Sequence, residues 1–151
     1  MKDMKTAVVG IGATGSVLAA ALLTRSPDTF LIGRRPELGG TLRQKGINIS
    51  GEINLQTAVR NYSDRIGDLK DFSPDLIFLC TKTFHIEQVL RDLRGVFTPQ
   101  VRIISTHNGL GPEDLIADEY GKAAALRMSL NYGVSVKADG EVQAAFFNRP
   151  N

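Results

Sequence analysis

The feature that most constrains the fold is a glycine-rich turn near the amino terminus, placed between an apolar run and a helix-like stretch. The apolar run covers residues 6–9, and the helix-like stretch continues to Thr24. With this spacing, the first glycine permits a tight turn, the second lets the backbone approach a pyrophosphate, and the third lets helix and strand pack closely. The start of the helix adds unpaired N–H groups and a partial positive charge. We therefore predict a dinucleotide-binding turn made of Gly10, Ile11, Gly12, Ala13, Thr14 and Gly15.

The same stretch admits a second interpretation as an export signal or a membrane anchor. Thr6 to Thr24 contains no charged residue, follows Lys2 and Lys5, and includes a run of small side chains. The glycines interrupt the apolar core, however, and fit the dinucleotide turn better. We therefore expect no membrane association and a cytoplasmic protein, which agrees with a single cysteine in 151 residues.

The rest of the chain alternates short apolar runs with helix-like stretches, which is typical of a parallel sheet covered by helices. Further strands are expected over residues 29–32, 76–80 and 101–105, a short helix or loop over 36–45, and helices over 83–93 and 112–120. Residues 46–60 alternate apolar and polar positions and predict a small hairpin or pair of strands. Two last strands, 126–135 and 141–147, are expected about a tight turn at Ala138-Asp139-Gly140. The predicted fold class is α/β: a Rossmann-like, doubly wound, mostly parallel sheet with helices on both faces, ending in a strand hairpin.

Composition and charge exclude several classes of function. Hydrophobic residues make up 42% of the chain and the net charge is only +2, so it is neither disordered nor strongly basic. Basic residues are scattered apart from one Arg pair, so we expect no nucleic-acid partner. His85 and His107 have no cysteine or carboxylate at ligand spacing, so we expect no metal site. Cys80 lies in the most apolar run, which predicts a buried, unreactive thiol.

The end of the second expected strand indicates which dinucleotide binds. NAD sites place a carboxylate there, about 20 residues after the turn, to hold the ribose 2′-hydroxyl. This chain has Gly33-Arg34-Arg35 at that point, and the first carboxylate is Glu37. A guanidinium grips a 2′-phosphate and gains nothing from a hydroxyl. The predicted cofactor is NADP(H), with Arg34 as the main contact and Arg35 as a second; a solvated Arg pair is the alternative.

Two polar residues follow later expected strands, where ligands of doubly wound sheets lie. Lys82 follows the strand 76–80, and Asn108 follows the strand 101–105. Lys82 can bond ribose hydroxyls or add positive charge near a carbonyl, and Asn108 offers both a donor and an acceptor. We expect both to line the cofactor site, although an exposed lysine and a simple Asn-Gly turn are the alternatives.

Together these motifs resemble the ketopantoate reductase (2-dehydropantoate 2-reductase) family. The shared features are Gly10-x-Gly12-x-x-Gly15, Arg34, Thr81-Lys82-Thr83, His107-Asn108-Gly109-Leu110-Gly111 and Ala138-Asp139-Gly140-Glu141-Val142. The resemblance runs from Met4 to about Phe147. It implies NADPH-dependent reduction of a keto acid, 2-dehydropantoate, to pantoate, a step of pantothenate and coenzyme A biosynthesis. It also implies that Lys82 contacts the cofactor ribose near the nicotinamide, and that Asn108 contacts both cofactor and substrate.

The resemblance further implies parts that this chain lacks. The family's proton-donating lysine and substrate-binding carboxylate come from a helical C-terminal domain, so residues 1–151 are expected to form the NADP-binding domain alone. We assign no catalytic residue here, expect the isolated chain to be nearly inactive, and expect any homodimer to form mainly through the other domain.

The chain also departs from the family pattern at two places. His85 stands where the family commonly has Gln, and Asn148-Arg149-Pro150 stands where it usually has a small or glycine-rich stretch. His85 leaves open a related reductase acting on another 2-keto acid, and a non-catalytic module that senses NADP is a separate alternative.

Overall fold

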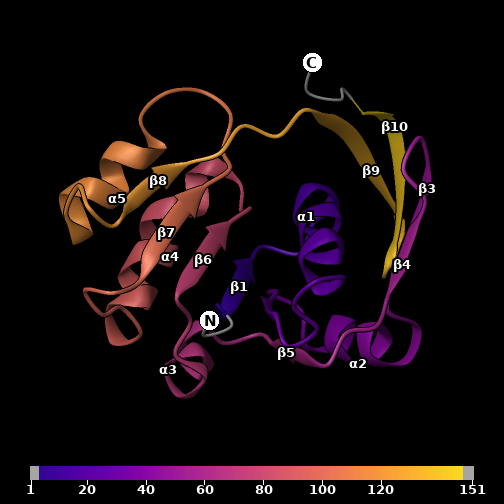
Figure 1. The fold of residues 1–151 in the computed structure, drawn as a ribbon, viewed down its shortest axis with the longest axis horizontal. Coiled ribbons are helices and arrows are strands. Elements are labelled where there is room, and N and C mark those ends of the chain that lie inside the picture. The colour runs from indigo at the N-terminus through magenta and orange to yellow at the C-terminus, as the bar shows by residue number, and fades with distance from the viewer. Residues whose placement is uncertain (1–3, 148–151) are drawn as a thin grey trace.

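In the computed structural model, which describes residues 4–147, two β-sheets lie on either side of one central helix (Figure 1). The first sheet has six parallel strands in the order β5-β2-β1-β6-β7-β8. Their bounds are β1 Thr6–Val9, β2 Phe30–Ile32, β5 Asn61–Ser63, β6 Leu76–Leu79, β7 Arg102–Ser105 and β8 Ala125–Arg127. The second sheet has the order β4-β3-β10-β9, with β3 Ile47–Gly51, β4 Leu55–Thr57, β9 Tyr132–Ala138 and β10 Glu141–Phe147. The Rossmann-like α/β class with a terminal hairpin is confirmed.

Helices cover both faces of the parallel sheet, as predicted. They are α1 Ala13–Leu23, α2 Pro36–Lys45, α3 Leu69–Phe72, α4 Ile86–Asp92 and α5 Pro112–Tyr120, with short 3₁₀ turns η1 Ile66–Asp68, η2 Thr83–His85 and η3 Leu93–Gly95. Side chains of β1 alternate between the two faces: Val8 joins the core with α1 and α2, whereas Ala7 and Val9 join the core with α3, α4 and α5. Both faces of the sheet are therefore buried, which is why its strands read as continuous apolar runs.

Helix α1 is buried between the two sheets. It contacts β1 on one side and β3, β4, β9 and β10 on the other (Figure 1), and Ala19 and Ala20 have no exposed surface. A helix that is apolar on nearly every face needs partners all round. This burial accounts for the uncharged stretch from Thr6 to Thr24 without a membrane. None of the helices described in residues 4–147 has the length and apolar character needed to cross a bilayer.

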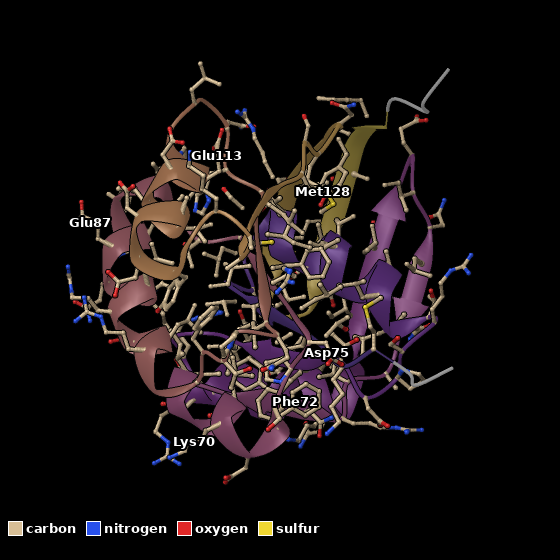
Figure 2. The ribbon with its side chains drawn as sticks, turned by 60° about the vertical axis from the view of Figure 1, so that its left-hand side comes forward. Lys70, Phe72, Asp75, Glu87, Glu113 and Met128 are labelled. Atoms are coloured by element: carbon tan, nitrogen blue, oxygen red, sulfur yellow. The ribbon has the colours of Figure 1, made fainter. Side chains whose placement is uncertain are left out.

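The largest difference from the sequence prediction concerns the expected strand 126–135. Ala125–Arg127 instead forms β8, which pairs with β7 and completes the parallel sheet. The chain then crosses to the second sheet through Met128, which is labelled in Figure 2 and donates its backbone N–H to the Ser105 carbonyl at 2.9 Å. Only at Tyr132 does β9 begin. The alternating pattern over residues 126–135 is therefore divided between two sheets. Alternation shows that one side of a strand is buried, but it does not show which strand is its partner.

Three smaller differences concern short elements. The expected helix 83–93 is split into η2, α4 and η3, although its apolar face is buried as predicted. The elements β5 and α3 were not predicted, because neither carries a long apolar run. The expected hairpin in 46–60 is present as the antiparallel pair β3 and β4. The departure at Asn148–Pro150 lies outside the described residues.

Candidate functional site

A cleft of about 660 Å³ opens where β1, β2, β5 and β6 end at their carboxyl termini. It is lined by the turn after β1, the loop after β2, the segment after β5, and the start of the helical segment after β6. These residues are Val9–Gly12, Ile32–Arg35, Leu38, Asp64–Gly67, Cys80–Lys82, His85, Gln88, Val89 and Asp92. Ligands of doubly wound sheets lie in such crevices, outside the carboxyl ends of the strands.

The glycine turn divides into positions that the fold requires and one that it leaves open. Gly10 has a φ of +100°, and a Cβ there would lie 2.7 Å from the Cys80 carbonyl carbon. A Cβ on Gly15 would overlap the carbonyl oxygen of Gly10. At Gly12, by contrast, no atom lies within 4 Å of the position a Cβ would take. Gly10 and Gly15 therefore let β1, α1 and β6 approach, while Gly12 leaves space that a ligand can use.

The start of α1 presents backbone donors to the cleft. Gly12 is the N-cap residue and provides no side-chain cap, and the first helical bond runs from the Ser16 N–H to the Gly12 carbonyl at 2.9 Å. The N–H groups before Ser16 have no acceptor within the helix, and such groups bind anions. The cleft lining does not include Ala13, Thr14 or Gly15. The Thr14 carbonyl accepts a 3.0 Å hydrogen bond from the Tyr132 hydroxyl, and this bond ties α1 to β9.

The two arginines after β2 have different surroundings, although both line the cleft. The Arg35 guanidinium binds Asp139 in the β9–β10 turn, with Nη2 2.5 Å from Oδ1, and this bond raises the pKa of Arg35. Arg34 is exposed and forms no ion pair with any described residue; its Nη1 lies 2.9 Å from His85 Nε2. Arg34 is therefore a cation open to an anionic ligand, whereas Arg35 ties the first sheet's loop to the second sheet.

The residues predicted beyond the later strands fall at different distances from the cleft. Lys82 lines it and is exposed, and its ammonium group makes no hydrogen bond or ion pair within residues 4–147; its backbone carbonyl accepts a 2.9 Å hydrogen bond from the His85 N–H. Asn108 is exposed in the loop between β7 and α5 and does not line the cleft. The strands that precede these two residues, β6 and β7, are neighbours in the sheet. Lys82 and Asn108 thus follow adjacent strand ends, but only Lys82 belongs to the described cleft.

A buried polar network joins the ends of β6 and β7. His107 Nδ1 lies 3.0 Å from Ser105 Oγ, and His107 Nε2 lies 3.3 Å from Thr81 Oγ1. Thr106 Oγ1 donates to the Leu79 carbonyl at 2.8 Å. This network holds Thr81 at the cleft and fixes where the loop carrying Asn108 begins. The sequence predicted no structural role for His107, which is part of the motif shared with the family; in the structure its ring links Ser105 to Thr81.

Burial lowers the pKa of His107, partly offset by a hydrogen bond with Thr81. Because the folded pKa lies below the unfolded value of about 6.5, the unfolded chain takes up the proton first, and stability falls as pH falls below that value. We expect the urea midpoint of the chain to decrease between pH 7.5 and 5.5. A His107→Asn variant should show a smaller decrease, whatever its stability at pH 7.5. An equal decrease in both proteins would contradict the assignment.

Cys80 lines the cleft and is half-buried, and its burial raises the pKa of its thiol to about 11. A free cysteine has a pKa of about 8.5 and reacts as the thiolate. At pH 8 we therefore expect iodoacetamide to modify Cys80 more than about 100-fold more slowly than a free thiol, as followed by mass spectrometry. Modification at the rate of glutathione would show that the thiol is neither buried nor raised in pKa.

Sequence reasoning missed the contribution of β5 to the cleft. Asp64–Gly67 follow this strand and line one end of the cleft. Tyr62 supports the loop after β2: its hydroxyl donates to the Arg35 carbonyl at 2.7 Å, and its ring fills the space that a side chain at Gly33 or Gly39 would need. The glycine just before the arginines was the available signal, since it indicates close packing against the loop.

Within the described part of the chain, no three His, Cys, Asp or Glu side chains gather in a way that could hold a metal ion.

Comparisons with known proteins agree with this architecture. The family model for the ketopantoate reductases PanE/ApbA matches residues 6–149. The 2-dehydropantoate 2-reductase of Pyrococcus abyssi is 33% identical over 140 residues, which cover 93% of this chain and 44% of that relative. The chain therefore spans less than half of that relative's length.

Two solved structures show the same fold. The 2-dehydropantoate 2-reductase of Porphyromonas gingivalis W83 superposes with a TM-score of 0.81 at 17% identity, over 95% of this chain and 52% of that one. A D-mandelate dehydrogenase solved with NADH and anilino(oxo)acetate superposes with a TM-score of 0.71 at 22% identity, over 93% of this chain and 45% of that one. The match of the family model over nearly the whole chain, together with the Pyrococcus relative, shows that the chain belongs to the ketopantoate reductase PanE/ApbA family.

Proposed function

We propose that this chain is the NADPH-binding domain of a reductase that converts 2-dehydropantoate to pantoate. The observation that carries the proposal is the composition of the cleft: open space at Gly12, uncapped N–H groups at the start of α1, and the unpaired cation Arg34 all lie at one edge of the sheet. Membership of the family supports the choice of reaction, since the Pyrococcus abyssi relative is named a 2-dehydropantoate 2-reductase.

The cleft suggests a location for each part of the cofactor. The pyrophosphate would lie against the Gly10–Gly15 turn, bound by the backbone N–H groups at the start of α1, including those of Ala13 and Thr14. The 2′-phosphate would bind Arg34, and Arg35 would contribute less because Asp139 already occupies its guanidinium. Lys82 would contact the ribose next to the nicotinamide. A bound nicotinamide supplies the hydride that reduces the keto group.

The chain's own part in the reaction is binding and orientation. Lys82 would bring positive charge to the end of the cleft where the carbonyl oxygen becomes an alkoxide, and such charge stabilises the transition state. Asn108, on the loop after the adjacent strand, would contact cofactor and substrate from the rim. The Thr81–His107–Ser105 network would keep these two strand ends in register. The proton of the product is assigned to no residue of this chain.

The proposal extends to the setting of the protein. We expect a cytoplasmic enzyme whose partner is a small keto acid, and we expect any homodimer to form mainly outside residues 1–151. The short 3₁₀ and helical segments at the cleft rim, with Phe84 79% exposed, are consistent with a surface that a further domain covers. Measuring sedimentation of the chain with and without the rest of the protein would test the dimer directly.

The reaction is tested by following the absorbance of reduced nicotinamide in the protein that contains this chain. We expect NADPH to be oxidised faster with 2-dehydropantoate than with pyruvate, 2-oxobutanoate or benzoylformate. With 2-dehydropantoate as substrate, we expect NADH to be oxidised more slowly than NADPH. Turnover of only another 2-keto acid would contradict the proposed substrate and would still support a reductase. NADPH binding without turnover of any keto acid would favour a non-catalytic NADP-sensing module.

A further inference from the structure

A hydrogen bond spans the cleft above the glycine turn. Arg34 follows β2 and His85 ends η2 after β6, and these two strands flank β1 on opposite sides. The 2.9 Å contact between Arg34 Nη1 and His85 Nε2 therefore crosses the end of β1. The imidazole also packs against the Phe84 ring, with 4.3 Å between ring centroids. His85 thus lines the cleft and is half-buried.

The chemistry of the pair restricts its protonation. A guanidinium only donates hydrogen bonds, so His85 must accept through Nε2 and carry its single proton on Nδ1. A doubly protonated imidazole cannot accept, and it would place a second cation beside Arg34. An anion between the two side chains removes this conflict, because both groups can then donate to it. Without a ligand, the hydrogen bond therefore joins a neutral imidazole to a cationic guanidinium. A bound phosphate instead favours a positive charge on both side chains.

We propose that Arg34 and His85 form one phosphate subsite, and that binding a 2′-phosphate there takes up a proton on His85. This inference rests on the proposed function, because it names the residue that helps Arg34 to recognise the cofactor's 2′-phosphate. His85 is a specificity-determining residue in this account, and it makes the preference for NADPH over NADH depend on pH.

Several charged groups near the pair are bonded to other residues. Arg65 is held by Asp68 at 2.9 Å, and the Asp92 carboxylate accepts a 2.7 Å hydrogen bond from Gln88. Glu87 lies on the outer side of α4, pointing away from the sheet in Figure 2, and pairs with Arg91 at 3.8 Å. The charged groups that line the same cleft as His85 are Arg34, Arg35, Asp64, Arg65, Lys82 and Asp92. Of these, Arg34 is the one that contacts the imidazole.

The test compares the chain with His85→Gln between pH 8 and pH 6, using NADPH and NADH titrations at each pH. Glutamine keeps an acceptor for Arg34 but does not titrate. The phosphate's own second ionisation, with a pKa of about 6, occurs with both proteins and is therefore removed by comparing them. Imidazole side chains titrate in this range. We expect the ratio of NADPH to NADH affinity to rise at least about fivefold more in the wild-type chain than in H85Q over these two pH units, with a limit of about tenfold per pH unit.

Calorimetry in two buffers of different ionisation enthalpy counts the protons directly. Uptake of more protons by the wild-type chain than by H85Q on NADPH binding, with no difference on NADH binding, supports the proposal. Identical pH profiles and proton counts in the two proteins would overturn it while leaving the proposed function intact. Failure of NADPH to bind at any pH would overturn the proposed function itself. Equal thermal midpoints of the two proteins at pH 8 establish that the substitution preserves the fold.

Discussion

Replacing Arg34 by glutamine is expected to weaken NADPH binding about 30- to 100-fold and to leave NADH binding nearly unchanged. A hydrogen bond to a charged group contributes about 1.5–3 kcal/mol, and about 1.4 kcal/mol corresponds to a factor of ten. Arg34 forms no ion pair with the described residues, so its charge is available to the 2′-phosphate. Fluorescence titration with both cofactors at fixed ionic strength measures the effect, because salt screens exposed charges.

Arg35→Gln provides the matched control, because it removes the same charge from the next residue. The Arg35 guanidinium is bound to Asp139, so we expect its loss to change the ratio of NADPH to NADH affinity by less than about threefold, or about 0.6 kcal/mol. Because the pair is exposed, its loss should cost the fold little. A large loss of NADPH affinity in R35Q, with little in R34Q, would exchange the roles of the two arginines.

Alanine substitutions at Gly12 and Gly15 are expected to separate binding from folding. At Gly15 the new methyl group would overlap the Gly10 carbonyl oxygen, a backbone atom that no side-chain rotation can move. Overpacking of this kind costs about 1–3 kcal/mol or more, which exceeds the about 1 kcal/mol that alanine gains over glycine in a helix. We expect G15A to lower the thermal midpoint by several degrees, measured by circular dichroism.

At Gly12 the same substitution should act on the ligand. The backbone there has φ −93° and ψ −161°, which alanine adopts freely, and no protein atom lies within 4 Å of the new Cβ. We expect G12A to stay within about 1 kcal/mol of the wild-type stability and to lose at least about tenfold in affinity for both NADPH and NADH, since the methyl group occupies the path of the pyrophosphate. A G12A variant that binds as well as wild type would show that the pyrophosphate does not lie against this turn.

The parts of the fold that the sequence predicted are those encoded by local pattern. The glycine spacing, the buried strands and the positions of most helices follow from apolar runs and turn residues a few positions apart. The glycines already favoured a dinucleotide turn over a membrane anchor for the segment from Thr6 to Thr24, and the structure adds that a second sheet covers α1. An all-round apolar helix indicates burial on two sides, but it does not say whether lipid or protein provides the cover.

The parts that could not be predicted depend on contacts between distant segments. The parallel pairing of β3 with β10 joins Asn48 to Glu141, and nothing local to either hairpin specifies the other as a neighbour. The same holds for β8, whose three residues belong to the parallel sheet because β7 has a free edge there. Strand β5 carries polar residues around Tyr62, so its place at the other edge of the sheet has no apolar signature.

The candidate site shows the same division. The type of residue at Arg34 and Lys82 and their positions after strands were sufficient to place both at the cleft. The sequence favoured Arg34 over Arg35, but it could not show that the Arg35 guanidinium is bound to Asp139, more than a hundred residues away. It also could not show that His85 faces Arg34 across β1, since that contact depends on how far η2 turns back over the sheet.

The most direct test of the central claim is isothermal titration calorimetry of this chain with NADPH and with NADH under the same conditions. We expect one site per chain and an affinity for NADPH at least about tenfold higher than for NADH, a difference of about 1.4 kcal/mol or more. Equal affinities would contradict the role of Arg34 in recognising a 2′-phosphate. Absence of binding by either cofactor would contradict the assignment of the cleft as a dinucleotide site.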